Sequence, residues 1–147
     1  INTANPTVTT ASRDFVKAAD GAGGWEGQVW DREIEVPVTT LDQLVAEHGE
    51  PAFCKIDVEG FEADVLRGLS KPLRALSFEF TTIQRDVALK CLDILARLGP
   101  YRFDLALGES QKLTFGQRVD RDAMARHIAG LPHEANSGDV YAVIDRG

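Results

Sequence analysis

Hydrophobic and polar residues in the middle of the chain follow two alternating periods. Residues 52–58 are mostly apolar apart from Lys55 and Asp57, which predicts a strand that is buried on both faces. Residues 61–69 carry apolar side chains at i, i+4 and i+8, which predicts a helix that ends before a Lys-Pro pair. This stretch is therefore expected to run from a strand through a polar loop into a helix.

The same succession repeats directly afterwards. Residues 73–80 alternate apolar with polar side chains and predict a second strand. A stripe of apolar residues at i, i+4, i+7, i+8 and i+11 then begins at Val87 and predicts a long helix, which Gly99 and Pro100 end. Two successive strand–helix units favour a parallel pair of strands.

The last third of the chain has a different connection between its strands. Residues 101–107 and 140–144 predict strands, and residues 120–129 predict a helix between them. Residues 131–138 are rich in Pro, Asn and Gly and predict a loop. The expected order is βαβα followed by an antiparallel pair of strands, which places the chain in the α/β class.

The first part of the chain carries shorter signals. Ser12 is positioned to cap a short helix, and residues 21–27 are rich in glycine. These glycines do not have the spacing of a dinucleotide-binding loop, because Glu26 stands where the third glycine belongs, so we expect a flexible turn. Residues 33–38 alternate charged with apolar side chains up to Pro37 and predict an edge strand or an extended approach to the next helix.

A capping box marks the next helix. Thr40 and Gln43 have its spacing, and apolar residues share one face of residues 41–48, before Gly49 and Pro51. The sequence therefore predicts a helix over residues 41–48.

Composition narrows the class of protein. A chain of 147 residues with 44% hydrophobic and 27% charged side chains is expected to form one soluble globular domain. The net charge of −7 and the lack of a basic cluster argue against nucleic acid as a partner. No apolar run approaches the roughly 20 residues of a membrane span, so we expect a cytoplasmic protein without membrane contact. Cys54 and Cys91 are expected to be free, buried thiols.

Three carboxylates lie where two of the predicted strands end. Asp57 and Glu59 follow the first central strand, and Glu79 lies near the end of the second. Ligands of parallel sheets bind beyond the carboxyl ends of the strands, where such groups bind cations, hydroxyls or amines, or act as acid and base. A structural alternative is that Asp57 caps the next helix and that Glu59 and Glu62 merely favour its N-terminus, with Glu62 exposed.

Two motifs on either side of the first central strand resemble a known family. Residues 38–44 read VTTLDQL, and residues 55–68 read KIDVEGFEADVLRG. This pair closely resembles the hallmark of the FkbM family of S-adenosylmethionine-dependent methyltransferases. The resemblance is close over residues 38–80, and the later elements fit the family in order and length.

The resemblance implies a fold, a reaction and roles for the three carboxylates. It implies the C-terminal part of a Rossmann-like class I methyltransferase sheet, with S-adenosylmethionine as cofactor and a hydroxyl of a sugar or natural product as acceptor. Asp57 and Glu59 are then the candidate catalytic residues, with Asp57 also beside the cofactor. Glu79 and Glu59 are the candidate substrate-binding residues, His133 is an outside candidate for the base, and no metal ligand is assigned.

The same resemblance implies a missing first half. The glycine-rich cofactor loop and the ribose-binding acid of the family have no counterpart before Val38, and three βα units of roughly 30 residues each do not fit into 37 residues. We therefore expect residues 1–147 to be a single domain that is the C-terminal portion of a larger methyltransferase domain, and the activity of this portion by itself stays open. Residues 1–37 would be an irregular lead-in and residues 38–147 the core.

Two other functions stay open at this point. A magnesium-dependent phosphoryl-transfer enzyme would use Asp57 and Glu59 as oxygen ligands, although the sequence has no phosphate-binding loop. A non-catalytic assembly module would pair its open sheet edge with a partner or a second copy of the chain, so an oligomer is possible.

Overall fold

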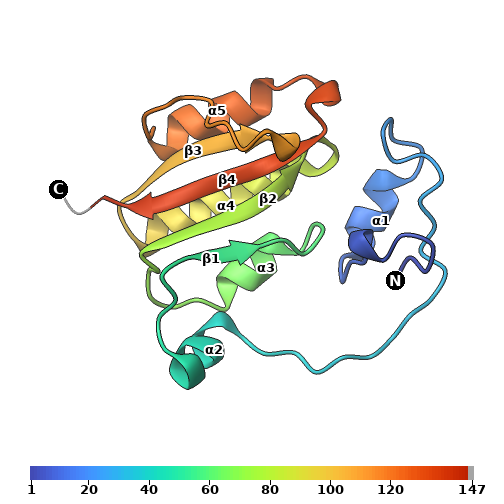
Figure 1. Ribbon diagram of the computed structural model, residues 1–147, viewed down its shortest axis with the longest axis horizontal. Coiled ribbons are helices and arrows are strands. Elements are labelled where there is room, and N and C mark those ends of the chain that lie inside the picture. Colours follow the sequence, from blue (N-terminus) through green and yellow to red (C-terminus); the bar gives the residue numbers. More distant parts are fainter. Residues whose placement is uncertain (146–147) are drawn as a thin grey trace.

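A mixed four-stranded sheet forms the centre of the computed structural model, which describes residues 1–145 (Figure 1). The strands are β1 (Cys54–Ile56), β2 (Ala75–Thr81), β3 (Tyr101–Leu107) and β4 (Ser137–Ile144). Their order in the sheet is β1-β2-β4-β3. The β1–β2 pair is parallel, whereas β4 runs antiparallel to both β2 and β3. The predicted α/β class and the closing antiparallel pair are confirmed.

Three helices pack on one face of this sheet. They are α3 (Glu62–Arg67), α4 (Arg85–Leu98) and α5 (Arg121–Gly130). Figure 1 shows α4 behind β2 and β4, and α4 contacts both α3 and α5. Alternate residues of β2 are buried on this side and join the buried apolar residues of α4 and α5 in one core: Leu76, Phe78, Phe80, Leu92, Leu95, Met124 and Ile128. The predicted period-2 and helical patterns thus describe this layer correctly.

The first predicted central strand is corrected in length and in environment. β1 has only three residues instead of the seven of residues 52–58, and it lies at the edge of the sheet. Cys54 is half-buried, Lys55 is exposed and only Ile56 is buried. The apolar residues of the segment 52–58 therefore do not indicate a strand buried on both faces, because β1 has a neighbouring strand on one side only among residues 1–145. Cys91, in α4, is buried, and both thiols are free.

The N-terminal part is extended over much of its length but is not irregular throughout. Helix α1 (Arg13–Ala19) begins at Ser12, whose side chain accepts from the backbone N–H of Phe15, as the capping pattern predicts. Phe15 is completely buried and meets the rings of Trp25 and Trp30 edge-on. The expectation of an irregular lead-in is therefore corrected for this helix and its aromatic cluster.

The segment that joins α1 to α2 (Leu41–His48) departs in part from prediction. Residues 33–38 are extended but form no ladder, and Ile34, Val36 and Val38 are 58%, 63% and 86% exposed. Of the two predicted alternatives, the structure has the extended approach and not the edge strand, because alternation alone supplies no pairing partner. In contrast, the capping box before α2 is confirmed in full.

Short 3₁₀ turns complete the chain. They are η1 (Pro6–Val8), η2 (Thr82–Gln84), η3 (Gly108–Ser110) and η4 (His133–Ala135). Within residues 1–145, each helix is too short or too polar to cross a membrane.

Candidate functional site

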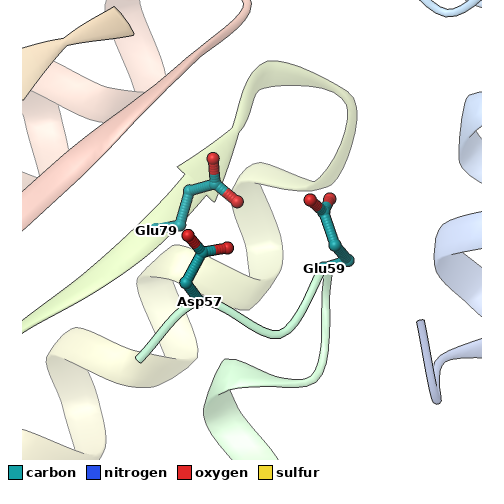
Figure 2. A group of neighbouring side chains, drawn as sticks. All are labelled: Asp57, Glu59 and Glu79. Atoms are coloured by element: carbon teal, nitrogen blue, oxygen red, sulfur yellow. The ribbon is translucent and has the colours of Figure 1, made fainter. Parts of the chain in front are cut away.

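Three carboxylates from two neighbouring strand ends meet at one edge of the sheet. Asp57 directly follows β1, Glu59 lies in the next turn, and Glu79 belongs to β2. Figure 2 shows the three side chains turned toward one another. One carboxylate oxygen from each residue lies within 4.8 Å of the corresponding oxygens of the other two. The convergence expected from the sequence is present in the structure.

Strand register explains why residues 22 positions apart come together. Ile56 of β1 and Phe78 of β2 are the last pair of the β1–β2 ladder. The next residues, Asp57 and Glu79, therefore lie side by side just beyond it. Parallel strands bring their carboxyl ends to the same edge, which is where ligands of α/β sheets bind. The register therefore builds this part of the site from backbone hydrogen bonds.

A tight turn positions the third carboxylate. Glu59 has a φ of 51°, which is unusual for a residue with a side chain, and Gly60 follows with a φ of 86°. A Cβ atom at position 60 would lie 2.3 Å from Oε1 of Gln84 and 2.8 Å from the ring of Phe15. Only glycine fits here, and the turn holds Glu59 above the sheet edge.

A fourth carboxylate, Glu62, braces the same turn. Its Oε1 accepts hydrogen bonds from the backbone N–H groups of Val58 and Gly60, both at 3.2 Å. The side chain is buried, which corrects the expectation of an exposed carboxylate in the first turn of a helix. The residue that precedes α3 is Phe61, so the alternative in which Asp57 caps this helix is wrong.

Burial and mutual repulsion raise the pKa values of two of the three converging groups. Desolvation, with the nearby charge of Asp57 as the second cause, raises the pKa of Glu59 from 4.5 to about 7. The same two causes, together with a hydrogen bond to Asp57, raise the pKa of Glu79 from 4.5 to about 8. One cation opposes this negative charge: Lys55 Nζ lies 3.3 Å from Asp57 Oδ2 and 3.5 Å from Asp139 Oδ1.

The site also contains residues that sequence reasoning missed. Asp139 lies opposite Glu79 because β4 inserts next to β2, and a single sequence does not reveal that insertion. Gln84 ends η2 and lines, with Gly60, Glu62 and Glu79, a small cavity. Within the described part of the chain, the oxygen atoms Glu59 Oε2 and Gln84 Oε1 are buried without a hydrogen-bond partner. From the sequence, Gln84 could have been identified only as a polar residue at the start of the helix that follows β2.

An open cleft of about 1070 Å³ lies beside the turn. Asp57, Val58 and Phe61 line one part of it, and residues of the N-terminal segment, including Trp30 and Ile34, line the rest. This segment is tied to the turn, because the hydroxyl of Thr10 donates to the carbonyl oxygen of Glu59 at 2.6 Å. The exposed carboxylate of Asp57 therefore has access to a volume of the size that a cofactor or a substrate occupies.

The outside candidate His133 is placed elsewhere. Its Nε2 lies 3.2 Å from the carbonyl oxygen of Gly23, and its own carbonyl accepts from the hydroxyl of Thr82. Residues 1–145 show no bond between His133 and the three carboxylates, so the structure does not bring it into this site.

Comparison with models of known protein families identifies a family for this chain. Residues 3–105 match the family described as the methyltransferase FkbM domain. The matched span is more than half of the chain, and it contains all three converging carboxylates and the turn between β1 and α3. A search among curated proteins finds no match.

Proposed function

Because the chain belongs to the FkbM methyltransferase family, we propose that it is the C-terminal portion of an S-adenosylmethionine-dependent O-methyltransferase. Its acceptor would be a hydroxyl of a sugar or of another natural product. The observation that carries this proposal is the meeting of Asp57, Glu59 and Glu79 at the carboxyl ends of two parallel strands, beside an open cleft.

The sheet supports a place in the later half of a class I methyltransferase domain. A parallel pair followed by antiparallel strands is what the resemblance implies for that half. Within residues 1–145, β1 is paired on one side only, so its other edge is available to a further strand of a larger domain. In this proposal residues 38–147 are the core, and residues 1–37 are a lead-in that contributes to the lining of the cleft.

The chemistry needs a positioned hydroxyl and an acceptor for its proton. The hydroxyl oxygen forms a bond to the methyl carbon of the sulfonium while the carbon–sulfur bond breaks, and the hydroxyl proton leaves to a carboxylate. Asp57, at the cleft, is proposed to hold the positively charged donor and, with Glu59, to provide the proton acceptor. Glu79 and Glu59 are proposed to orient the acceptor hydroxyl by hydrogen bonds.

Methyl transfer by the product of the complete reading frame that encodes this chain tests the proposal. Donor-dependent methylation of a panel of sugars and natural products, measured by mass spectrometry, should give products methylated on oxygen. Asp57→Asn should lower turnover by about 10² to 10⁴, the usual contribution of a general base. The matched control is Asp86→Asn, which removes the same charge from the exposed first turn of α4.

Two results would contradict the proposal. One is methylation of nitrogen or carbon atoms only, and the other is full turnover of Asp57→Asn at saturating donor and acceptor. Thermal melts of both variants should accompany the rates, so that a loss of folding is recognised.

The chain alone should bind the donor weakly. Its strand ends face the cofactor from one side, so calorimetry with residues 1–147 should give a dissociation constant above about 10 micromolar, or roughly −7 kcal/mol. Tighter binding would mean that the chain contains most of the cofactor contacts.

A further inference from the structure

We infer that Asp57, Glu59 and Glu79 bind a hard divalent cation, with the buried amide of Gln84 lining a small cavity beside Glu79. The inference departs from the sequence analysis, which assigned no metal ligand to the methyltransferase. The binding site stands on the geometry of these four residues, whereas any part of the cation in methyl transfer rests on the proposed function.

The separation of the carboxylates matches the size of a coordination sphere. One oxygen from each of the three residues lies within 4.8 Å of the others. Oxygen ligands bind Ca²⁺ at about 2.3–2.6 Å, so two oxygens on opposite sides of the ion lie roughly 4.6–5.2 Å apart. The smaller Mg²⁺, with oxygens at about 2.0–2.1 Å, requires the side chains to close in slightly. The present spacing therefore accommodates Ca²⁺ and, after small side-chain rotations, Mg²⁺.

Among residues 1–145, a single ammonium group lies close to the converging carboxylates. Asp57, Glu59 and Glu79 face one another, and buried Glu62 lies next to them. The ammonium group of Lys55 approaches Asp57 but is shared with Asp139. Carboxylates that are brought together and partly buried are costly unless a cation compensates them.

A neutral oxygen on a side chain that lines the small cavity beside Glu79 provides an independent observation. Gln84 is only 8% exposed, and its Oε1 has no hydrogen-bond partner among residues 1–145. This oxygen lies against Gly60, and its side chain lines the same small cavity as Glu79 and Gly60. A buried amide oxygen without a donor costs about 1–3 kcal/mol, and carboxamide oxygens are ordinary ligands of hard cations and of the waters bound to them. The cavity has about the volume that one water needs.

The site lies at the edge of the large cleft, so a cation bound there could contact a substrate in the cleft. Asp57 belongs both to the carboxylate group and to the lining of the cleft. A cation held there can take an acceptor hydroxyl as an additional ligand, and a hydroxyl bound to a cation gives up its proton more easily. This role would favour acceptors with two neighbouring oxygen atoms, which can bind the ion together.

Calorimetric titration of the chelator-treated chain with CaCl₂, MgCl₂ or MnCl₂, without methyl donor, tests the inference. Wild type should bind at least one of these ions with a dissociation constant below about 1 mM, the weak end of protein calcium sites. Glu79→Gln should weaken binding by at least roughly tenfold to a hundredfold. Gln84→Met, which has a similar shape and lacks the oxygen, should weaken it less, and Asp86→Asn should bind as wild type does.

The possible outcomes separate the cation site from the proposed function. Failure of wild type to bind any of the three ions at 10 mM, on the order of ten times the expected limit, would overturn the inference, as would equal binding by wild type and Glu79→Gln. Circular dichroism identifies variants that fail to fold. Cation binding without methyl transfer by the complete enzyme would leave the site in place and refute only the proposed function.

Discussion

Two regions around β2, the face that the helices cover and the end near the carboxylates, lie in different physical environments. Toward the helices, Phe78 is completely buried among apolar side chains. A polar group of the same core is paired, because the hydroxyl of Tyr101 donates to the carbonyl oxygen of Leu73 at 2.6 Å. Toward the strand ends, Glu79 meets two further carboxylates. There, the oxygen atoms Glu59 Oε2 and Gln84 Oε1 are buried without partners among the described residues.

This difference distinguishes residues that stabilise the fold from residues that the fold keeps in an unfavourable arrangement. The helical side buries its apolar residues in one core, and its unpartnered buried nitrogens among residues 1–145, Arg85 Nε and His127 Nε2, carry no like charges that face one another. The carboxylate edge keeps like charges close together and a residue with positive φ, and both features lower stability. Groups in such an arrangement are typical of binding and catalytic sites, where a ligand supplies the missing partner.

The largest expected effect comes from breaking the helical side. Phe78→Ala removes a ring that is completely buried next to α4, and such substitutions cost about 3–5 kcal/mol. This is a large part of the roughly 5–15 kcal/mol that stabilises a domain. Urea denaturation should show the loss as a lower midpoint. A change below about 1 kcal/mol would mean that Phe78 does not belong to a tightly packed core.

An intermediate effect is expected where the two regions meet. Glu62→Ala leaves the backbone N–H groups of Val58 and Gly60 without their acceptor, and a buried unsatisfied donor costs about 1–3 kcal/mol. Glu62→Gln keeps an oxygen acceptor and should cost less. The pair of variants, compared by urea denaturation, separates the loss of hydrogen bonds from the loss of charge. Equal stability of Glu62→Ala and wild type would show that the brace is not needed.

The sequence predicted the helical side better than the edge. The period-2 pattern of β2 and the apolar stripe of α4 depend on local spacing, and both elements are found with nearly the predicted limits. The predicted strand ends also indicated that Asp57 and Glu79 lie together, because the carboxyl ends of parallel strands lie at the same edge of the sheet. These features follow from the chain's own periodicity.

What the sequence missed depends on contacts between distant segments. The burial of Glu62 results from a turn with positive φ at Glu59, and the Gln84 oxygen is buried by the same turn. The insertion of β4 beside β2 brings Asp139 next to the site from about 60 residues away along the chain. Residues 33–38 had a strand pattern without a partner strand. Local periodicity contains no information on any of these.

The smallest effect, and the one opposite in sign, is expected at Glu79. Its pKa of about 8 in the folded chain lies above its ordinary value of 4.5, and that of Glu59, about 7, is raised likewise. The folded state therefore binds more protons than the unfolded state between pH 4.5 and 8, so the free energy of unfolding falls as the pH rises through this range. The charged groups around Glu79 are Asp57, Glu59, Glu62 and Asp139, with Lys55 as the opposing cation.

Glu79→Gln removes the part of this dependence that comes from Glu79, without changing the shape of the side chain. In chelator-treated buffer at pH 8 the variant should be more stable than wild type, by on the order of 1 kcal/mol because solvent screens part of the repulsion. Near pH 4.5, where wild-type Glu79 is protonated in the folded state, the two should be equally stable. Urea denaturation at both pH values measures this difference, with Asp86→Asn as the control for the loss of one surface charge. A Glu79→Gln variant that is less stable than wild type at pH 8 would show that this carboxylate stabilises the fold, and that the edge of the sheet is built by the same rule as its helical face.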